Sequence, residues 1–293
     1  MNVTGFEACV ENIGYLNRKY EKISHCIKVH VSEAVRIGAN GLRFEDIISD
    51  TDSAIEKLNT AIKGMSSEFG YPETLLRLLF CKSLADTVSM PSAKALCKMI
   101  SPIEETVSEQ TVISCLRGKM SDEAYGRFSV AFDNARIRYA DTFSTVCENV
   151  YHSVCDFAVM PHENSDDGIL QGFSNLIDKY ELYTVGSVEL ENENDFGTTS
   201  YALLAKNPMI INVGGKMRVS VKMTQERNYT PRLFAIGEYF SAQLLQIHSV
   251  SLSDKRNRTQ CVFELSDDNP CPLVLALLLN IPGIEVRGIY RAN

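Results

Sequence analysis

The chain has 293 residues, a hydrophobic content of 45%, a formal net charge of −8 at pH 7 and a sequence pI near 5.3. That hydrophobic content is typical of a folded globular protein, and the length suits two or three domains. The acidic balance argues against a nucleic acid or an anionic membrane as partner, because no basic field would attract phosphates. No apolar run approaches the ~20 residues that span a bilayer, and the N-terminus lacks the basic start and apolar core of a signal peptide.

The nine cysteines are odd in number and scattered, and several lie in apolar runs. This usage favours free thiols in a reducing cytoplasm over a disulfide framework. The chain has no C-x-x-C pair, and His25 and His30 are five residues apart, a poor spacing for two ligands on one helix face. The sequence therefore predicts a cytoplasmic protein with no metal site.

Residues 1–105 are predicted to form a helical domain. Glu, Lys, Ala, Ile and Leu dominate this region, and apolar residues recur at spacings of three and four. Asp50 suits the first turn of one helix, whose end is expected at Gly64, and Pro72 is expected to start another. A turn is expected at Asn40-Gly41.

From Thr111 the pattern changes to short strands alternating with helices. Alternation of this kind implies parallel strands covered by helices. The third of these strands is expected to stop at Pro161, because proline has no N–H for the strand ladder. The strands are expected at 111–116, 136–140 and 155–161, and the helices at 121–132 and 141–153.

A group of polar side chains follows that third strand. Glu163, Asn164 and Ser165 come directly after its predicted end, and Asp166-Asp167-Gly168 is expected to cap and open a helix. Open α/β sheets place ligand sites just past the carboxyl ends of their strands. The segment is therefore a candidate binding site, and the alternative is a strand-to-helix turn with a purely structural cap.

From about Gly215 the pattern predicts strands and helices in the order βαββαβ, which is the ferredoxin-like arrangement. The strands are expected at 216–224, 244–252, 258–265 and 283–290, and the helices at 231–243 and 270–280.

The run Pro161-His162-Glu163-Asn164-Ser165, followed by Gly168, resembles the signature of the prephenate dehydratase family. In that family a strand ends in P-x-E-N-S and a glycine follows closely. Residues 197–206, GTTSYALLAK, resemble the family's T-R-F strand, and the C-terminal βαββαβ region resembles the ACT regulatory domain that usually follows. The resemblance covers roughly residues 111–293.

The resemblance implies a multidomain chain of mixed α+β and α/β class. A helical N-terminal domain at 1–105 would precede a truncated α/β lobe of the periplasmic-binding-protein type at 110–208. A ferredoxin-like ACT domain would follow at 215–293. Families with this dehydratase often carry a helical chorismate mutase domain at the N-terminus, so residues 1–105 are a candidate remnant of one. The alternative is a helical packing or dimerisation domain.

The family's reaction removes water and carbon dioxide from prephenate to give phenylpyruvate, and it needs no cofactor. A positioned hydroxyl can help the leaving group depart, and a guanidinium can hold a carboxylate with two parallel bonds. The T-R-F motif supplies both groups, and the resemblance assigns the catalytic hydroxyl to Thr199. It implies contacts with a prephenate-like dianion at Glu163, Asn164, Ser165, Thr198, Ser200, Gly118 and Ser121.

The chain departs from the family pattern in two ways. Ser200 stands where the family has its arginine, so Arg117 or Lys119 would have to supply the positive charge. Typical members also insert a second lobe before the T-R-F strand, whereas here only a few residues separate Leu190 from Thr198. The acidic run Glu189 to Asp195 is expected to be a solvated loop in place of that lobe.

The ACT-like region suggests either an amino-acid effector site or a dimerisation module without a ligand. Family motifs for phenylalanine map onto Leu233, His248 and Ser249, of which only the serine is retained. In both cases we expect a homo-oligomer formed through this region, because its apolar edge strands need cover.

Two functions follow from these observations. One is a divergent prephenate dehydratase of phenylalanine biosynthesis. The other is a catalytically degenerate relative that acts as a binding or regulatory protein.

Overall fold

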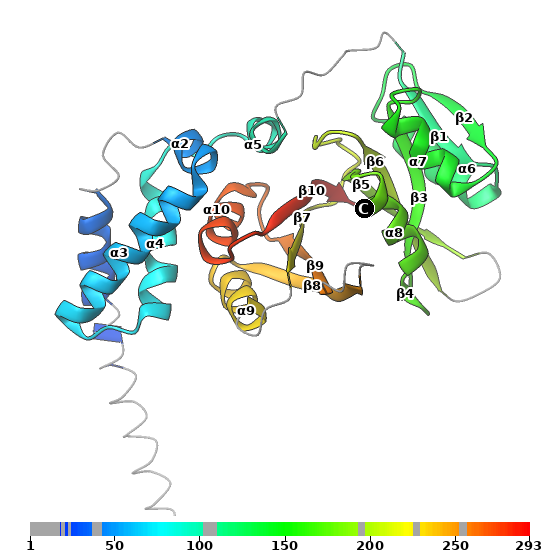
Figure 1. Cartoon of the computed structure of the whole chain (residues 1–293). Helices are drawn as coiled ribbons and strands as arrows, with labels where there is room; N and C mark the ends of the chain where they lie inside the picture. The colour runs from blue at the N-terminus through cyan, green and yellow to red at the C-terminus, as the bar shows by residue number, and fades with distance from the viewer. Residues whose placement is uncertain are drawn as a thin grey trace, which may run out of the picture. The chain divides into compact units, whose positions relative to one another are not determined.

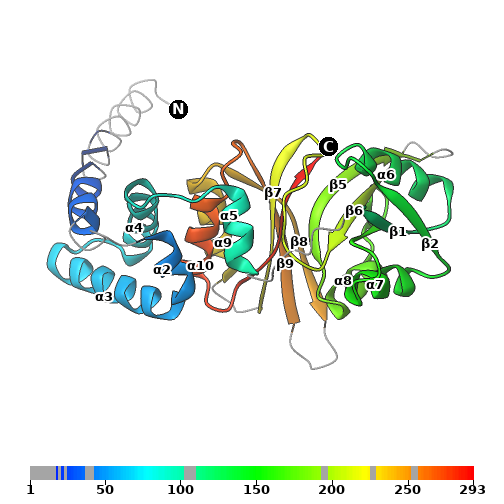
Figure 2. The same cartoon turned by 90° about the horizontal axis from the view of Figure 1, so that it is seen from above.

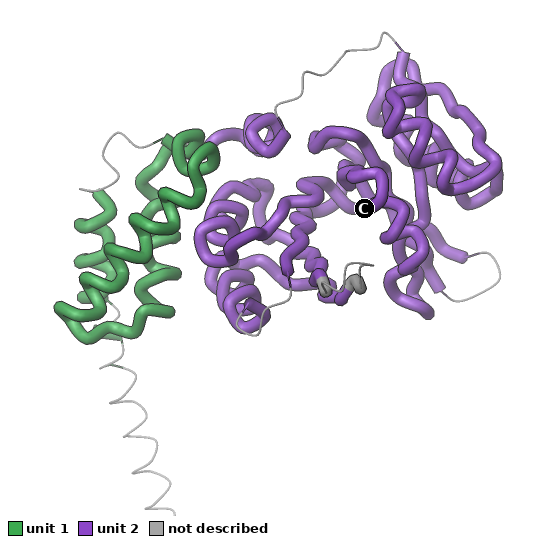
Figure 3. Tube along the Cα trace, in the orientation of Figure 1, with its two compact units in different colours: residues 1–90 green, residues 91–293 purple. Residues whose placement is uncertain are grey.

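The computed structural model describes residues 18, 21–22, 25–36, 43–101, 110–192, 197–224, 229–251 and 257–293. The chain divides into two compact units, residues 1–90 and 91–293, shown in Figure 3. None of the helices in these described ranges combines the length and the apolar character that a membrane span requires.

The first unit is helical, as the sequence predicts. Residues 25–36 are helical, and α2 (Phe44–Ser49), α3 (Thr51–Phe69) and α4 (Glu73–Thr87) follow. Pro72 precedes α4 as its N-cap residue, as expected. The expected turn at Asn40-Gly41 lies outside the described residues. Apolar side chains from all of these helices are buried, among them Val31, Phe44, Ile47, Leu58, Ile62, Leu76 and Phe80.

Helix α3 is longer than the sequence indicates. It begins after Asp50, whose carboxylate accepts the N–H of Ser53 at 3.2 Å. The expected end at Gly64 is wrong, because the helix continues to Phe69 and stops at Gly70. Gly70 has a φ of 69°, the left-handed conformation that ends many helices and that glycine adopts without strain.

The second unit is built on one mixed ten-stranded sheet, with the strand order β2-β1-β3-β6-β5-β10-β7-β9-β8 and β4 beside β3. The division at Met90 places α5 (Ala93–Ile100) in this unit. The first half, which we call the lobe, contains β1 (Val112–Leu116), α6 (Lys119–Ser129), β2 (Arg136–Ala140), α7 (Phe143–Tyr151), β3 (Phe157–Asn164), β4 (Gly168–Ile169), α8 (Gln171–Lys179), β5 (Tyr183–Glu191) and β6 (Thr198–Ala205).

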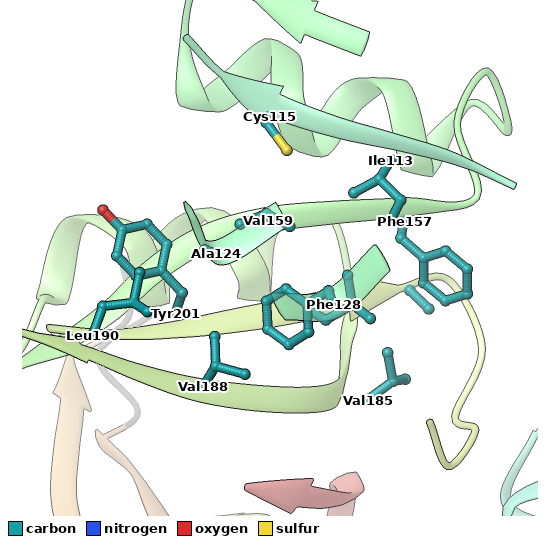
Figure 4. Close-up of a cluster of buried hydrophobic side chains, with 12 residues drawn as sticks. Ile113, Cys115, Ala124, Phe128, Phe157, Val159, Val185, Val188, Leu190 and Tyr201 are labelled. Atoms are coloured by element: carbon teal, nitrogen blue, oxygen red, sulfur yellow. The ribbon is translucent and has the colours of Figure 1, made fainter. Parts of the chain in front are cut away.

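Helices cover both faces of the lobe's sheet, as Figure 2 shows. The first three strands are parallel, as predicted, and β6 runs antiparallel to both β3 and β5. On one face α6 packs over a buried cluster that includes Phe128, Leu203 and Tyr201 (Figure 4). On the other face α7 and α8 pack over a second cluster that includes Met160 and Leu204. Alternate residues of each strand therefore belong to different faces.

Strand β3 does not end at Pro161. It continues to Asn164, and its register against β6 shifts between Pro161 and Glu163, so His162 is an extra residue at a bulge. A proline lacks the N–H that a regular ladder needs, and a bulge is one of the few strand positions that tolerate it. The bulge carries the strand three residues further than predicted and brings Glu163 into the sheet.

Asp166-Asp167-Gly168 forms a turn and does not open a helix, contrary to the prediction. The side-chain oxygen of Asn164 accepts the N–H of Asp166 at 2.6 Å and that of Asp167 at 3.0 Å. This is the turn that an asparagine makes with its own following backbone. Gly168, at a φ of 68°, then leads into β4, and α8 begins only at Gln171.

The acidic run is only partly a loop. Glu189 and Glu191 belong to β5, which extends through Glu191 and pairs with β6 along its length. Residues 193–196 lie outside the described residues. The expectation of a loop from Glu189 onward is therefore wrong, and Glu189 is held on a strand.

The second half of the unit, which we call the C-terminal sheet, follows the predicted order βαββαβ. Its elements are β7 (Lys216–Thr224), α9 (Tyr229–Tyr239), β8 (Ala242–Ser251), β9 (Asn257–Leu265), α10 (Cys271–Asn280) and β10 (Glu285–Ala292). All its strand pairs are antiparallel. Helices α9 and α10 lie on one side of it and the lobe lies on the other (Figure 1).

The two faces of the C-terminal sheet differ in polarity. Val219 and Val221 of β7 are buried apolar residues, whereas Ser220 and Lys222, on the opposite face, are buried and polar. Buried polar groups require partners. The lobe provides them, because Asp178 of α8 forms an ion pair with Lys222.

Strand β10 joins the two halves. It pairs in parallel with β5, with Gly288 opposite Thr184 and Ala292 opposite Ser187. The chain end extends this pairing, since the N–H of Asn293 donates to the carbonyl of Ser187 at 3.1 Å. A Cβ atom at Gly288 would lie 2.7 Å from the backbone oxygen of Thr184, so only glycine allows this approach.

We predict that Gly288→Ala destabilises the second unit by roughly 1–3 kcal/mol, because the new methyl group would force β10 away from β5. Urea denaturation followed by circular dichroism measures the loss. Gly126→Ala is the matched control, since a Cβ at Gly126 of α6 would meet nothing within 4 Å and that variant should be at least as stable as wild type. Equal stability of the two variants would contradict the prediction.

Candidate functional site

A cleft of about 240 Å³ lies where the ends of three lobe strands meet the C-terminal sheet. The lobe contributes polar side chains from β3, β5, β6 and the turn after β3, and the C-terminal sheet contributes side chains from β7 and β8. The lining residues are Glu163, Asn164, Ser165, Glu189, Thr198, Ser200, Arg218, Leu245 and Gln246.

The floor of the cleft is a row of three side chains on neighbouring strands. Ser200 of β6 pairs with Glu163 of β3 on one side and with Glu189 of β5 on the other. Residues directly opposite each other on paired strands project from the same face, with Cβ atoms about 4.5–5.5 Å apart. A hydroxyl therefore lies between two carboxylates.

Backbone contacts fix the turn that carries Ser165. Its N–H donates to the carbonyl of Thr198 at 2.9 Å, and its hydroxyl oxygen accepts the N–H of Thr198 at 3.0 Å. Gly197 permits this approach, because a Cβ there would lie 2.5 Å from the Ser165 hydroxyl. The predicted substrate contacts Glu163, Asn164, Ser165, Thr198 and Ser200 are thus together in one cleft.

Thr199 is near these residues in the sheet but does not line the cleft. The register sets it opposite Asn164, so the two segments meet as expected. Its side chain lies on the α6 face with Tyr201, because side chains alternate along a strand. Its hydroxyl donates to the side-chain oxygen of Asn192 at 2.8 Å. This placement does not support the predicted catalytic role.

Gly118 and Ser121 are also outside the cleft. Gly118 is the N-cap residue of α6, which packs on the face opposite to α7 and α8. Ser121 is buried and forms a hydrogen bond with the hydroxyl of Tyr201. Burial raises the pKa of that tyrosine. Gly118 and Ser121 are therefore not among the residues that line this cleft, and their contact with a ligand stays a prediction.

The C-terminal sheet forms the second wall of the cleft. The side-chain amide of Gln246 on this wall donates a hydrogen bond to the carboxylate of Glu163 on the lobe. Arg218 reaches the cleft from β7, and its Nε and Nη2 atoms lie 3.2 and 3.1 Å from one oxygen of Glu264. Lys216 binds the other oxygen of Glu264 at 2.6 Å, and the hydrogen bonds from Lys216 and Arg218 hold the pKa of Glu264 below its ordinary value.

Sequence reasoning missed Arg218, Leu245, Gln246 and Glu189 as lining residues. The available signal was the period-two polarity of 218, 220 and 222 in an otherwise apolar strand, which indicates a polar face that something must cover. The lobe covers this polar face because β10 pairs with β5, and no local sequence pattern indicates that pairing.

A second, smaller cavity of about 40 Å³ lies beside the cleft, between α8 and the C-terminal sheet. Asp178 lines this cavity, and its Oδ2 atom lies 2.5 Å from Lys222 Nζ, with side-chain exposures of 4% for Lys222 and 14% for Asp178. His162 Nε2 lies 3.1 Å from the hydroxyl of Ser187. Burial, and to a lesser degree the charge of Arg218, lower the pKa of His162 to about 4.

The three predicted effector residues have different surroundings, and their role in binding an effector stays a prediction. His248 lines the smaller cavity, and burial lowers the pKa of its imidazole. Leu233 is fully buried in α9, and Ser249 is exposed on β8. His248 and Ser249 are adjacent on β8 and therefore project from opposite faces of the strand.

The described cysteines are free thiols, and most of them are buried. Burial raises the pKa of Cys115, Cys147 and Cys261 to about 12. Within the described ranges, no group of three or more His, Cys, Asp or Glu side chains is arranged to hold a metal ion.

No family model and no curated protein matches the chain. Among solved structures, a prephenate dehydratase from Streptococcus mutans is 18% identical, with a TM-score of 0.53, over 62% of this chain and 99% of that one. GqqA, described as a novel type of quorum quenching acylase, is 18% identical, with a TM-score of 0.50, over 64% and 97%. A prephenate dehydratase from Arthrobacter aurescens in complex with L-Phe is 10% identical, with a TM-score of 0.49, over 62% and 90%.

The first two likenesses show a shared mixed α/β fold. The first two proteins carry different activities in their names, so the fold by itself does not select a chemistry. The side chains that line the cleft determine what it can bind.

We predict that Asp178→Asn destabilises the second unit by about 3–5 kcal/mol, because it leaves the buried ammonium of Lys222 uncompensated. Urea denaturation provides the measurement. The double variant Asp178→Leu with Lys222→Met should lose much less, since it removes both charges. The control is Glu285→Gln, which removes a more exposed ion pair with Arg258, 3.9 Å apart. This control should lower the free energy of unfolding by at most about 1 kcal/mol. A small effect of Asp178→Asn would show that water reaches Lys222.

We also predict that stability falls as the pH is lowered from about 6.5 to about 4, because His162 takes up a proton in the unfolded chain and resists it in the folded one. The contribution of His162 is complete above pH 6.5 and amounts to at most about 3 kcal/mol. His162→Gln should flatten this dependence in urea titrations across the pH range, whereas the exposed His152→Gln should preserve it. An unchanged slope in His162→Gln would contradict the prediction.

Proposed function

We propose that this chain is a prephenate dehydratase-like protein that binds a small polar molecule in the cleft and does not dehydrate prephenate at an ordinary enzyme rate. The observation that carries the proposal is the charge of the cleft. The carboxylates of Glu163 and Glu189 line the cleft. Among the described residues, Arg218 is the one guanidinium in the lining, and it already forms hydrogen bonds with Glu264.

A dianionic substrate fits this cleft poorly. The family's anchoring arginine is replaced by Ser200, and the loss of a charge-assisted hydrogen bond costs about 1.5–3 kcal/mol. Two carboxylates near a carboxylate ligand add repulsion. The hydroxyl expected to assist the leaving group, that of Thr199, is bonded to Asn192 on the other face. Ser165 and Ser200 retain hydroxyls in the cleft, so hydrogen bonding to a ligand remains available.

A second candidate function is a working dehydratase in which the C-terminal sheet replaces the missing lobe. Two observations favour it. The C-terminal sheet walls the cleft through Gln246, which helps to exclude water, and Arg218 lines it as a cation in place of the family's arginine. This candidate requires Arg218 to leave Glu264 for the substrate.

The predicted domain layout of 1–105, 110–208 and 215–293 belongs to this proposal, as does the assignment of the last part as an ACT domain. Support comes from the βαββαβ succession and from its strand order β10-β7-β9-β8. A homo-oligomer through this part is supported by β8, which ends the sheet and exposes Leu245 and Ile247. For residues 1–105, a packing domain and a chorismate mutase remnant both fit a helical unit.

We predict that the purified chain gives no phenylpyruvate from prephenate above the uncatalysed background. The assay is the absorbance of phenylpyruvate, run on wild type, Arg218→Ala and Thr199→Ala, with the exposed Arg127→Ala as a matched control. Turnover near 10 s⁻¹, typical of an enzyme, would overturn the proposal. If that turnover were lost in Arg218→Ala and kept in Thr199→Ala and Arg127→Ala, the second candidate would be the function.

A further inference from the structure

We infer that the ligand of the cleft carries a primary ammonium group, bound between Glu163 and Glu189 above Ser200. The inference rests on the proposed function, in that it takes the cleft to be a binding site. It adds the chemical class of the ligand, namely a small aliphatic amine with a polar tail.

The geometry of the floor supports an ammonium. Glu163 and Glu189 lie on strands that flank β6, with Ser200 between them on the same face. A strand spacing of about 4.8 Å separates each neighbour, so the carboxylates can converge on a group above Ser200. An ammonium offers three donors and can bond two carboxylates and a hydroxyl at once.

The charges of the cleft support the same class. Lys216 and Arg218 share the carboxylate of Glu264, which leaves that group with one net positive charge. The two carboxylates of Glu163 and Glu189 contribute two negative charges to the same cleft. That of Glu163 is held by the uncharged amide of Gln246, and Glu189 has no ion-pair partner in the part of the chain that the structure describes. The cleft is therefore one charge short of neutrality, and a monocation restores the balance.

The remaining lining residues limit the rest of the ligand. Ser165 and Thr198 present polar groups at the rim, and Leu245 is the one large apolar side chain in the lining. A volume of about 240 Å³ is below the range of drug-sized pockets, which begins near 300 Å³. An aromatic ring would find little apolar surface here, whereas a short chain ending in a hydroxyl would find acceptors and donors.

The test titrates wild type at low salt by isothermal calorimetry with ethanolamine and 1,4-diaminobutane. Succinate is the matched anion, 1,4-butanediol the matched neutral compound, and MgCl₂ and CaCl₂ are the metal arms. We expect the amines to bind with a salt-dependent affinity and the other probes not to bind. Glu163→Gln and Glu189→Gln should each weaken amine binding roughly tenfold or more, which is the effect of losing a charge-assisted hydrogen bond.

Two further variants sharpen the result. Glu123→Gln, on the exposed side of α6, is the matched control and should leave amine binding unchanged. Ser200→Arg places a cation directly between Glu163 and Glu189, so it should abolish amine binding. Glu189 is exposed, so its substitution tests the inference even if Glu163→Gln disturbs the contact with Gln246.

The outcomes separate this inference from the proposed function. Binding of succinate or of a metal ion in place of amines, no binding of any probe, or amine binding that ignores both glutamate variants would each overturn the inference. Succinate binding would leave the cleft as a binding site. Prephenate turnover together with amine binding that depends on Glu189 would overturn the proposed inactivity and leave the amine site standing.

Discussion

The parallel pairing of β10 with β5 is the constraint on which the rest of the second unit depends. Without it, the polar face of the C-terminal sheet would be exposed to water, and β5 would be an open edge strand of the lobe. With it, the two sheets become one, and buried polar groups such as Lys222 must find partners on the lobe. Asp178 provides one, and Gln246 meets Glu163 nearby. The cleft is a consequence of this closure, because its two walls are the two halves of one sheet.

The same closure sets the electrostatics of the cleft. A cation that comes from β7 arrives with its own counter-ion on β9, since Arg218 and Glu264 are cross-strand partners. Ser200 on the lobe strand is flanked in the register by Glu163 and Glu189, so the lobe contributes two carboxylates to this row. The cation that lines the cleft is therefore already neutralised by its own counter-ion, which leaves the carboxylates of β3 and β5 in excess.

Local sequence patterns predicted most of the elements, because each depends on residues close in the chain. The βαββαβ order and the parallel strands followed from periodicity, and Pro72 marked a helix start. The strand end predicted at Pro161 is wrong, because a bulge accommodates a proline that a regular strand ladder excludes. The wall could not be predicted, since the pairing of 183–191 with 285–292 joins segments far apart in sequence and only Gly288 records the close approach.

The choice of face along β6 determines which resembled residues can act together. Thr199 and Ser200 are neighbours in sequence, yet one belongs to the α6 face and the other to the cleft. A motif match assigns roles by position and carries no information on which side of a sheet the partner groups will gather. Here the partners Glu163, Arg218 and Gln246 all gather on the side of Ser200. The cleft therefore presents a serine between two glutamates, whereas Thr199 bonds to Asn192 on the other face of the sheet.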